Sequence, residues 1–329
     1  MSHHYADHSH ELKSALGREI PTEALRELHA RRPVVHAGIA VALFSVLGLS
    51  SVLIANLDRW FLWLPFAVIS GFAVFNFTVM LHEVVHRTVL ATHDDRKNRF
   101  IGFLYSVPSG ISASQFTRWH LDHHAGLGSF EEDPKRHYLS PKINARWFKA
   151  LYFTPALFPI YFRAARLEAA SYPIELQKTI KRERLATILF HLGILGVLIA
   201  FAGFPLAWKI YMVPVFFVFP VAFALNRLGQ HFDIDPADPA KWATLVKGSR
   251  LWDVVFLFSN YHLEHHYFPM VPFYNLPALQ RLLAPFYERR GFSYRTYGQL
   301  LWQYLVLNRK PHTRWESAPS ADGLAVRQS

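Results

Sequence analysis

Residues 61–86 read FLWLPFAVISGFAVFNFTVMLHEVVH. The first part of this stretch, residues 61–81, is almost wholly apolar and has the ~20 residues that a helix needs to cross a hydrocarbon core of about 30 Å. Two histidines, His82 and His86, follow at once. A spacing of four residues places both imidazoles on one face of a helix, about one turn apart. The stretch therefore predicts a membrane-spanning helix that carries two histidines where it leaves the membrane.

Three other apolar runs of similar length accompany this one, at residues 34–55, 185–204 and 206–225. The chain of 329 residues is 51% hydrophobic and only 18% charged. A soluble domain typically carries about 25% charged residues, so this chain has too little polar material for a water-facing surface. The sequence predicts an all-α integral membrane protein: a bundle of four transmembrane helices with a cytosolic helical cap.

Basic residues set the expected orientation. The turns around Asp58 and Lys209 carry few of them, whereas Lys and Arg concentrate before the first span, between the second and third, and after the fourth. The positive-inside rule then places both termini and the histidines in the cytosol. The first residues lack the pattern of a secretory signal. We expect a cytosolic N-terminal segment (1–33), a membrane catalytic domain (34–283) and a cytosolic, partly disordered C-terminal segment (284–329).

Composition excludes several classes of site. The chain has no cysteine, so thiolate metal sites, disulfides and cysteine nucleophiles are excluded. Any metal site must use His, Asp, Glu or Asn. The net charge is +11, but no basic run with interleaved aromatics suggests nucleic acid as a partner. Basic loops that face anionic lipid headgroups explain this charge better.

Most of the other notable histidines occur in two more clusters on the expected cytosolic side. Residues 119–124 read WHLDHH and residues 260–266 read NYHLEHH. Both have the spacing i, i+3, i+4, which groups three imidazoles on one helical face. Together with His231, just after the fourth span, the candidate set is His82, His86, His120, His123, His124, His231, His262, His265 and His266.

The remaining histidines have simpler interpretations. His191 lies in the middle of the third span, where packing or a hydrogen bond within the protein is expected. The N-terminal group is expected to form a solvated tail with incidental metal affinity; it consists of His3, His4, His8 and His10.

Nine imidazoles point to a particular chemistry. Imidazole suits Fe, Cu, Zn and Ni, whereas hard cations prefer oxygen ligands. A structural zinc site needs four ligands and a catalytic one three, so nine histidines indicate two metal ions that share the set. With iron, such a site can reduce O2 and attack an unactivated C–H bond. The metal supplies that chemistry and the protein positions it.

Two other classes of function stay open at this point. His82-Glu83-Val84-Val85-His86 also satisfies HExxH, the zinc-protease signature in which Glu is the general base. A membrane zinc protease would leave both HxxHH clusters unexplained. A non-catalytic metal-binding or transport protein is the third class, but transporters usually place ionisable residues near the bilayer midplane. His231 by itself is also compatible with a histidine that caps helix carbonyls.

The three clusters in this order, over about residues 34–283, resemble the membrane fatty acid desaturase superfamily. The third one, with Tyr267, Phe268 and Pro269 after it, is similar to that of acyl-lipid and sphingolipid desaturases and of carotenoid ketolases. The resemblance implies two iron ions held by the box histidines and His231, with Asn226 in water-mediated contact. Four residues beside the ligands are expected to orient the ligand imidazoles without binding the metal themselves: Glu83, Asp122, Asn260 and Glu264.

The resemblance also implies an activity: O2-dependent introduction of a double bond into a lipid acyl chain held in an apolar tunnel. Hydroxylation and carotenoid ketolation are the alternatives within the superfamily. No His-Pro-Gly-Gly motif of a fused cytochrome b5 occurs, so an external electron donor is expected, a ferredoxin or cytochrome b5. Arg87, Arg96, Lys97 and Arg99 are expected either to bind this donor or to meet lipid headgroups.

Overall fold

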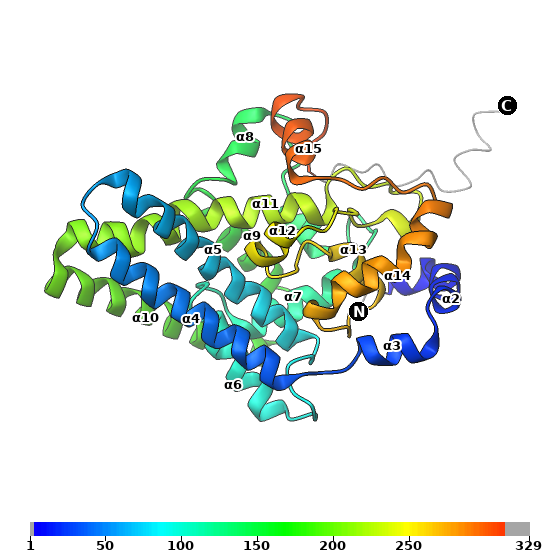
Figure 1. Ribbon diagram of the computed structural model, residues 1–329, viewed down its shortest axis with the longest axis horizontal. Coiled ribbons are helices and arrows are strands. Elements are labelled where there is room, and N and C mark those ends of the chain that lie inside the picture. Colours follow the sequence, from blue (N-terminus) through cyan, green and yellow to red (C-terminus); the bar gives the residue numbers. More distant parts are fainter. Residues whose placement is uncertain (1–2, 313–329) are drawn as a thin grey trace.

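The computed structural model describes residues 3–312 and shows a helical protein (Figure 1). Within those residues the only β contact is an isolated bridge between Val246 and Arg295, so the predicted all-α class is confirmed. In chain order the elements are α1 (His4–His8), α2 (His10–Glu19), α3 (Thr22–Leu28), α4 (Pro33–Ala55), α5 (Trp60–Val85), α6 (Asp95–Ser106), α7 (Ala113–Gly126), η1 (Lys135–Leu139), α8 (Arg146–Leu151), α9 (Leu157–Ala169), α10 (Ile174–Ala207), η2 (Trp208–Val218), α11 (Phe219–His231), η3 (Pro239–Lys241), α12 (Arg250–Val255), α13 (His262–Tyr267), η4 (Phe273–Asn275), α14 (Leu276–Arg289), α15 (Tyr297–Leu301) and η5 (Trp302–Val306).

Helices α4 and α5 are two candidate membrane spans. They have 23 and 26 residues and mean hydropathies of 2.3 and 1.9 in their most apolar windows. Pro33 begins α4, at the position where its missing N–H costs nothing. In α5, 61% of that window is buried inside the protein, against 22% in α4. Helix α5 therefore lies at the centre of the bundle, and α4 presents much of its apolar surface outward, as expected against lipid.

The third candidate span is one long stretch, Ile174–His231, of 58 residues. The sequence predicted two spans here, separated near Pro205. In the structure the helix starts earlier, at Ile174. Its first turns contain charged residues, so the apolar run in the sequence did not reveal them. The backbone breaks at Gly203, which has φ 78° and ψ 160°, a conformation open to glycine but costly for other residues. Figure 1 shows the chain turning back at this end of the bundle. By length and composition the described residues thus contain three candidate spans rather than four.

Close packing joins the returning segment to α5. A Cβ added at Gly71 would lie 2.4 Å from Cβ of Val218 in η2, so only glycine fits this contact. The absence of a side chain lets the two backbones approach, as small residues do between membrane helices. This contact fixes where α11, and the His231 at its end, lie relative to α5.

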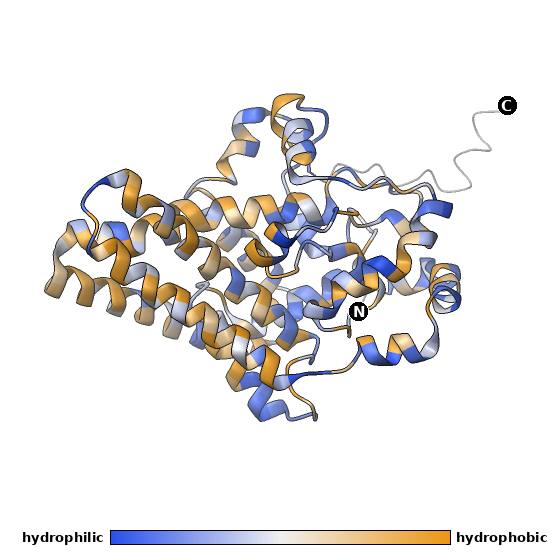
Figure 2. Ribbon diagram, viewed as in Figure 1, coloured by the Kyte–Doolittle hydropathy of each residue, from blue (hydrophilic) through white to orange (hydrophobic). Residues whose placement is uncertain are grey.

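The other end of the molecule is a more polar helical cap. Figure 2 shows apolar residues gathered along α4, α5 and α10, and more hydrophilic residues toward α2, α3 and α14. Helix α7 lies against α5, α6 and α10, and α13 packs on α14. The predicted domain boundary at residue 283 falls within α14, and α15 packs against α11. The C-terminal stretch 313–329, where disorder was predicted, lies outside the described residues.

The N-terminal segment forms helices that pack on the cap. Leu12, Leu16 and Ile20 are at most 4% exposed, and α2 contacts α14. Their spacing of four residues forms an apolar stripe along α2. In α1, the ring of His4 stacks on Trp242 at 5.5 Å. Of the histidines predicted to be solvated, His3, His8 and His10 are exposed and His4 is half-buried. The prediction of an unpacked tail is wrong, because it overlooked the buried leucines that follow them.

Candidate metal centre

Helix α5 delivers the first two histidines. The helix continues through His82 to Val85, and the N–H of His86 still bonds to the carbonyl of His82, at 3.3 Å. The two rings lie on one face with their centroids 4.9 Å apart, as the HxxxH spacing predicted. Arg87 then takes φ 56°, a left-handed conformation that ends the helix.

Helix α7 carries the second cluster, and its start is held by a carboxylate from α10. The Ser112 hydroxyl caps the helix by accepting from the N–H of Gln115. Glu183 accepts hydrogen bonds from the Ser112 hydroxyl (2.6 Å) and from the N–H (2.9 Å) and hydroxyl (2.6 Å) of Ser114. A carboxylate at a helix N-terminus also complements the helix dipole. Glu183 thereby ties the HxxHH helix to the long helix of the third span.

The third cluster lies on the short helix α13. All six of its residues are buried, and Leu257 and Phe258 before it have φ values of 47° and 62°. Left-handed backbone is costly for side chains of this size, so the surrounding packing must impose it. This turn lets a helix of six residues point His262, His265 and His266 at the other two clusters.

The structure brings all nine predicted histidines together in two groups. Within each group, the ring nitrogens that could bind a metal lie within 4.8 Å of one another. One group contains His82, His86, His120, His124 and His265; the other contains His123, His231, His262 and His266. Each HxxHH cluster therefore contributes to both groups. His231, the weakest member by sequence, is 5% exposed and belongs to the second group.

The spacing of the nitrogens fits metal coordination. Nε2 of His86 lies 2.8 Å from Nε2 of His120, and Nε2 of His262 lies 2.9 Å from that of His231 and 3.0 Å from that of His266. Two ligands at about 2.1 Å from one ion and at right angles to each other are about 3.0 Å apart. The lone pairs of such converging nitrogen acceptors repel one another unless a cation lies between them.

Burial keeps the imidazoles in the form that binds metals. Removal from water lowers the pKa of His120, His124, His262 and His265 well below the ordinary value, and lowers the pKa of His123 to about 4. These rings are neutral at physiological pH. A metal ligand must be neutral imidazole, so the groups need no deprotonation before they bind.

Two contacts from behind fix ring orientation in the four-histidine group. Nδ1 of His123 lies 2.8 Å from Oδ1 of Asp133, and Nδ1 of His231 lies 2.9 Å from the carbonyl oxygen of Trp242. In each case Nδ1–H donates outward and Nε2 points at the other histidines. Although burial by itself would raise the pKa of Asp133, His123 and Lys135 hold it below its ordinary value. Asp133 was not among the residues predicted from the sequence, because it lies beyond a turn that no local pattern specifies.

The four residues predicted to support the ligands have other partners. Asp122 forms an ion pair with Arg118 at 2.7 Å. Glu264 accepts from Gln280 and Tyr287, and Asn260 donates to Asp253.

Glu83, in the HExxH pattern, accepts from the hydroxyl of Thr88 (2.7 Å) and the N–H of Phe273 (3.1 Å). Its other oxygen is 3.6 Å from Nδ1 of His82, beyond hydrogen-bond distance. Glu83 is thus held by the cap, where it joins α5 to the segment after α13.

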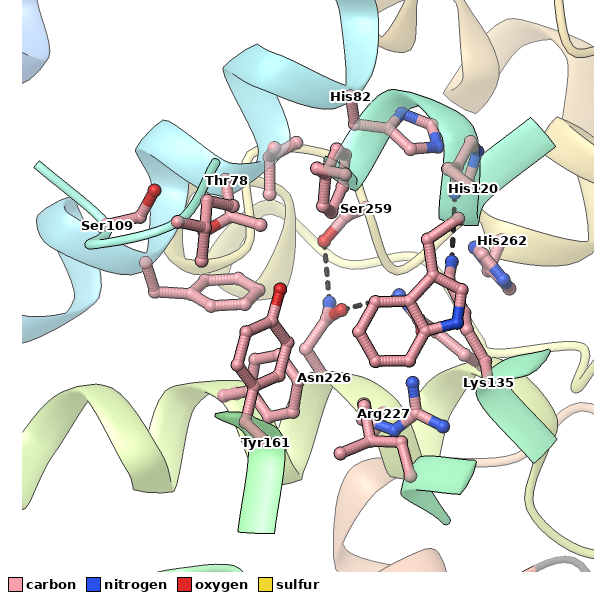
Figure 3. A pocket seen from close by; sticks show the side chains of 18 of the residues that line it. Thr78, His82, Ser109, His120, Lys135, Tyr161, Asn226, Arg227, Ser259 and His262 are labelled. Atoms are coloured by element: carbon pink, nitrogen blue, oxygen red, sulfur yellow. Dashed lines mark hydrogen bonds between the residues drawn. The ribbon is translucent and has the colours of Figure 1, made fainter. Parts of the chain in front are cut away.

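A cavity of about 120 Å³ opens beside the five-histidine group (Figure 3). Its lining includes His82, His120, His262 and His265 at one side and mostly aromatic and aliphatic side chains elsewhere. Asn226 also lines it: its amide donates to the Ser259 hydroxyl (2.6 Å) and accepts from Gln230 (2.7 Å). Asn226 thus faces the cavity.

Comparison with known proteins agrees with this geometry. The fatty acid desaturase family model matches residues 58–298, which contain all nine histidines and every element from α5 onward to the start of α15. The chain belongs to the fatty acid desaturase family. As a desaturase-family protein it is an oxidoreductase of lipid metabolism, which leaves the zinc-protease interpretation of residues 82–86 without support.

Curated relatives of this desaturase-family protein include enzymes named for sphingolipids. The human sphingolipid delta(4)-desaturase/C4-monooxygenase DES2 is 24% identical over 258 residues, which cover 75% of this chain and 73% of the relative. The rat sphingolipid delta(4)-desaturase DES1 is 23% identical over 283 residues, covering 82% and 80%.

His191 illustrates a residue outside the site that the sequence assigned correctly. Its ring lies 2.5 Å from the hydroxyl of Tyr211 and 2.8 Å from the carbonyl oxygen of Val107. It therefore joins α10, η2 and the turn before α7, as expected for a polar group inside a span.

Proposed function

We propose that this protein holds two iron ions and uses O2 to introduce a double bond into the acyl chain of a lipid. The observation that supports this most directly is the division of nine buried histidines into two groups, each large enough for one ion. Imidazole is a suitable ligand for iron. Iron, when bound, supplies the reduction of O2 and the removal of hydrogen from an unactivated C–H bond.

The chain's own residues hold, orient and shield this centre. His82, His86, His120, His124 and His265 would bind one ion, and His123, His231, His262 and His266 the other. Asp133 and the carbonyl oxygen of Trp242 keep His123 and His231 in the tautomer that leaves Nε2 for the metal. We assign Asn226 a contact through water, since its amide lies on the cavity wall.

The cavity supports a long-chain substrate. Phe75, Phe158, Phe219 and Phe223 line it, and each methylene buried against such a surface contributes about 0.8 kcal/mol. The named activities of the relatives include both delta(4)-desaturation and C4-hydroxylation of sphingolipids. Hydroxylation is therefore the second candidate reaction for this chain.

The same proposal includes four membrane crossings with the histidines on the cytosolic side. A straight helix of 58 residues would be about 87 Å long, far more than one hydrocarbon core of about 30 Å. A reversal at Gly203 divides the stretch into two crossings. The basic segments then all lie on the side of the histidines, in agreement with the positive-inside rule.

A separate protein would donate the electrons. All four basic residues expected on this surface are exposed. Arg87 pairs with Asp95 and Lys97 with Asp94, whereas among the described residues no carboxylate forms an ion pair with Arg96 or Arg99. We assign Arg96 and Arg99 to the docking surface for an acidic ferredoxin or cytochrome b5.

The test is mass spectrometry of total lipids from a host that expresses the chain, with His265→Ala and His266→Ala variants as controls. Acyl chains lighter by two hydrogens, present only with intact histidines and oxygen, support desaturation. Chains or carotenoids heavier by one oxygen instead move the reaction to hydroxylation or ketolation. An unchanged lipid profile with a protein that holds iron and a co-expressed donor would overturn the proposal.

A further inference from the structure

Arg227, on α11, is a buried cation on the wall of the cavity. Its side chain is 8% exposed, yet it belongs to the lining. The guanidinium donates one hydrogen bond to the Ser140 hydroxyl at 2.7 Å and lies over the ring of Phe223. Among residues 3–312, no carboxylate comes within ion-pair distance of it; Asp133 instead engages His123.

A buried cation without an ion-pair partner carries a cost in free energy. Removing a charge from water without a partner costs several kcal/mol, and arginine cannot avoid this by losing its proton. The guanidinium has five N–H donors, and the described contacts use one of them. A charge in this position, beside a cavity, is typical of a site completed by a ligand.

Lys135, next to Arg227, contacts a candidate metal ligand. It lines the same cavity, and its Nζ lies 2.9 Å from Nδ1 of His120. Burial lowers the pKa of Lys135, and the nearby carboxylate of Asp133, which attracts both Lys135 and Arg227, opposes this only in part. Asp133 lies beyond ion-pair distance of both cations, and its Oδ1 accepts from His123 and from two backbone N–H groups. Figure 3 shows Lys135 and Arg227 on the side of the cavity where His120 and His262 lie, and Thr78 and Ser109 on the other. The polar end of the cavity is therefore the end at the metal centre.

The rest of the cavity has the opposite character. Phe75, Phe158, Phe162 and Phe219 belong to its lining. A ligand that satisfies both parts carries an anionic oxygen group at one end and a hydrocarbon chain at the other. Charge-assisted hydrogen bonds from arginine to carboxylate or phosphate are among the strongest in proteins.

We propose that this cavity takes an anionic acyl lipid, whose carboxylate or phosphate is bound by Arg227 beside the histidines. This assignment rests on the proposed function and names its substrate class. Because the anion lies at the metal centre, the methylenes that react are those near the polar group, and the far end of the chain occupies the aromatic part. Arg227 is thus a specificity-determining residue.

Binding measurements test this independently of turnover. The purified full-length protein in a non-ionic detergent binds tritiated palmitate, and hexadecyl phosphate, hexadecanol and a ceramide compete for it. These competitors share a long chain and differ in the charge of the polar group. We expect hexadecyl phosphate to compete at a concentration at least about tenfold lower than hexadecanol or ceramide, equivalent to about 1.4 kcal/mol. The ranking of palmitate against hexadecyl phosphate shows whether carboxylate or phosphate is preferred.

Variants connect the preference to Arg227. Arg227→Gln is expected to abolish the preference for anions, and Arg227→Lys to retain part of it. Ser140→Ala removes the hydrogen bond that Arg227 donates but leaves the charge of Arg227 in place. Arg182→Gln removes an exposed charge outside the cavity. Both controls are expected to keep the preference. Monodispersity on a sizing column shows that each variant folds.

Equal competition by hexadecanol or ceramide in the unaltered protein would overturn the inference, whether or not Arg227→Gln folds. So would an anion preference that survives in folded Arg227→Gln. Either result can coexist with desaturation in the expression host, in which case only the substrate class fails. Anion-selective binding without any change in host lipids would instead refute the proposed reaction and leave the binding site in place.

Discussion

Asp133 Oδ1 lies 2.8 Å from Nδ1 of His123, and Nε2 of His123 lies 3.1 Å from Nε2 of His231. The carboxylate thus binds Nδ1 of the His123 ring, while Nε2 of the same ring faces the other histidines of the four-histidine group. Asp133 is 4% exposed and also accepts from the N–H groups of Lys135 and Arg136, so its own position is fixed by the start of η1.

Asp133→Asn is expected to weaken Fe²⁺ binding to the four-histidine group by about 10–100-fold, the usual effect of losing such an outer partner. An amide cannot stabilise the ring in the same way, and it can present N–H to Nδ1. Iron content per chain, measured after titration with a chelator, checks this. The matched control is Asp122→Asn, since Asp122 pairs with Arg118 and not with a candidate ligand. Equal iron retention in both variants would contradict the role of Asp133.

Glu183→Gln is expected to loosen the start of α7. Three hydrogen bonds to Ser112 and Ser114 lose their charge, and bonds to charged groups contribute about 1.5–3 kcal/mol each in favourable cases. Hydrogen exchange at the amides of residues 113–120 should become faster, and lipid oxidation should fall. Glu175→Gln is the control, because Glu175 is exposed and pairs only with Lys178 in its own helix. Unchanged exchange in α7 would argue against this tether.

Gly71→Ala is expected to destabilise the bundle by about 1–3 kcal/mol, because the new Cβ would lie 2.4 Å from Val218. Gly48→Ala, in α4, meets nothing within 4 Å and should be neutral or slightly stabilising through helix propensity. Thermal unfolding in detergent compares the two. A lower Tm for Gly48→Ala than for Gly71→Ala would show that the packing of α5 on η2 differs from that described.

The absence of native cysteine allows a clean test of the four crossings. Asp58→Cys and Ala202→Cys should react with a membrane-impermeant maleimide added outside intact cells. Lys181→Cys and Arg309→Cys should react only after permeabilisation, because they lie on the side of the histidines. If Ala202→Cys is labelled only after permeabilisation, the chain does not cross the membrane between Lys181 and Gly203.

Several features of the site were predictable from local pattern. Helical periodicity relates residues three and four apart, so the clusters at 82–86, 120–124 and 262–266 each had to present their rings on one face. His231 was harder, because a single histidine has no partner at helical spacing; its position after the fourth span suggested it, and the family resemblance strengthened the assignment. Asp133 carried no signal, since its contact with His123 depends on how the chain turns after α7.

Two other predictions, for the start of α10 and for the N-terminal segment, relied on one feature of the sequence and missed another. The charged first turns of α10 concealed the start of a helix that continues beyond the apolar run. The prediction for the N-terminal segment was based on its histidines and did not consider Leu12 and Leu16, which are buried where α2 packs on α14. In the second case the deciding contacts are with residues far away in the chain.

The sequence by itself determined the helical class, the apolar stretches that suit a membrane and the eight histidines that lie in clusters, because each depends on residues within one or two helical turns. Only the tertiary structure decided which histidines share a group. Each group combines residues from at least three separate segments, and His123 and His124 are neighbours in the chain yet belong to different groups. Adjacent residues on a helix point about 100° apart, so the packing of α5, α11 and α13 around α7 assigns each ring to its group.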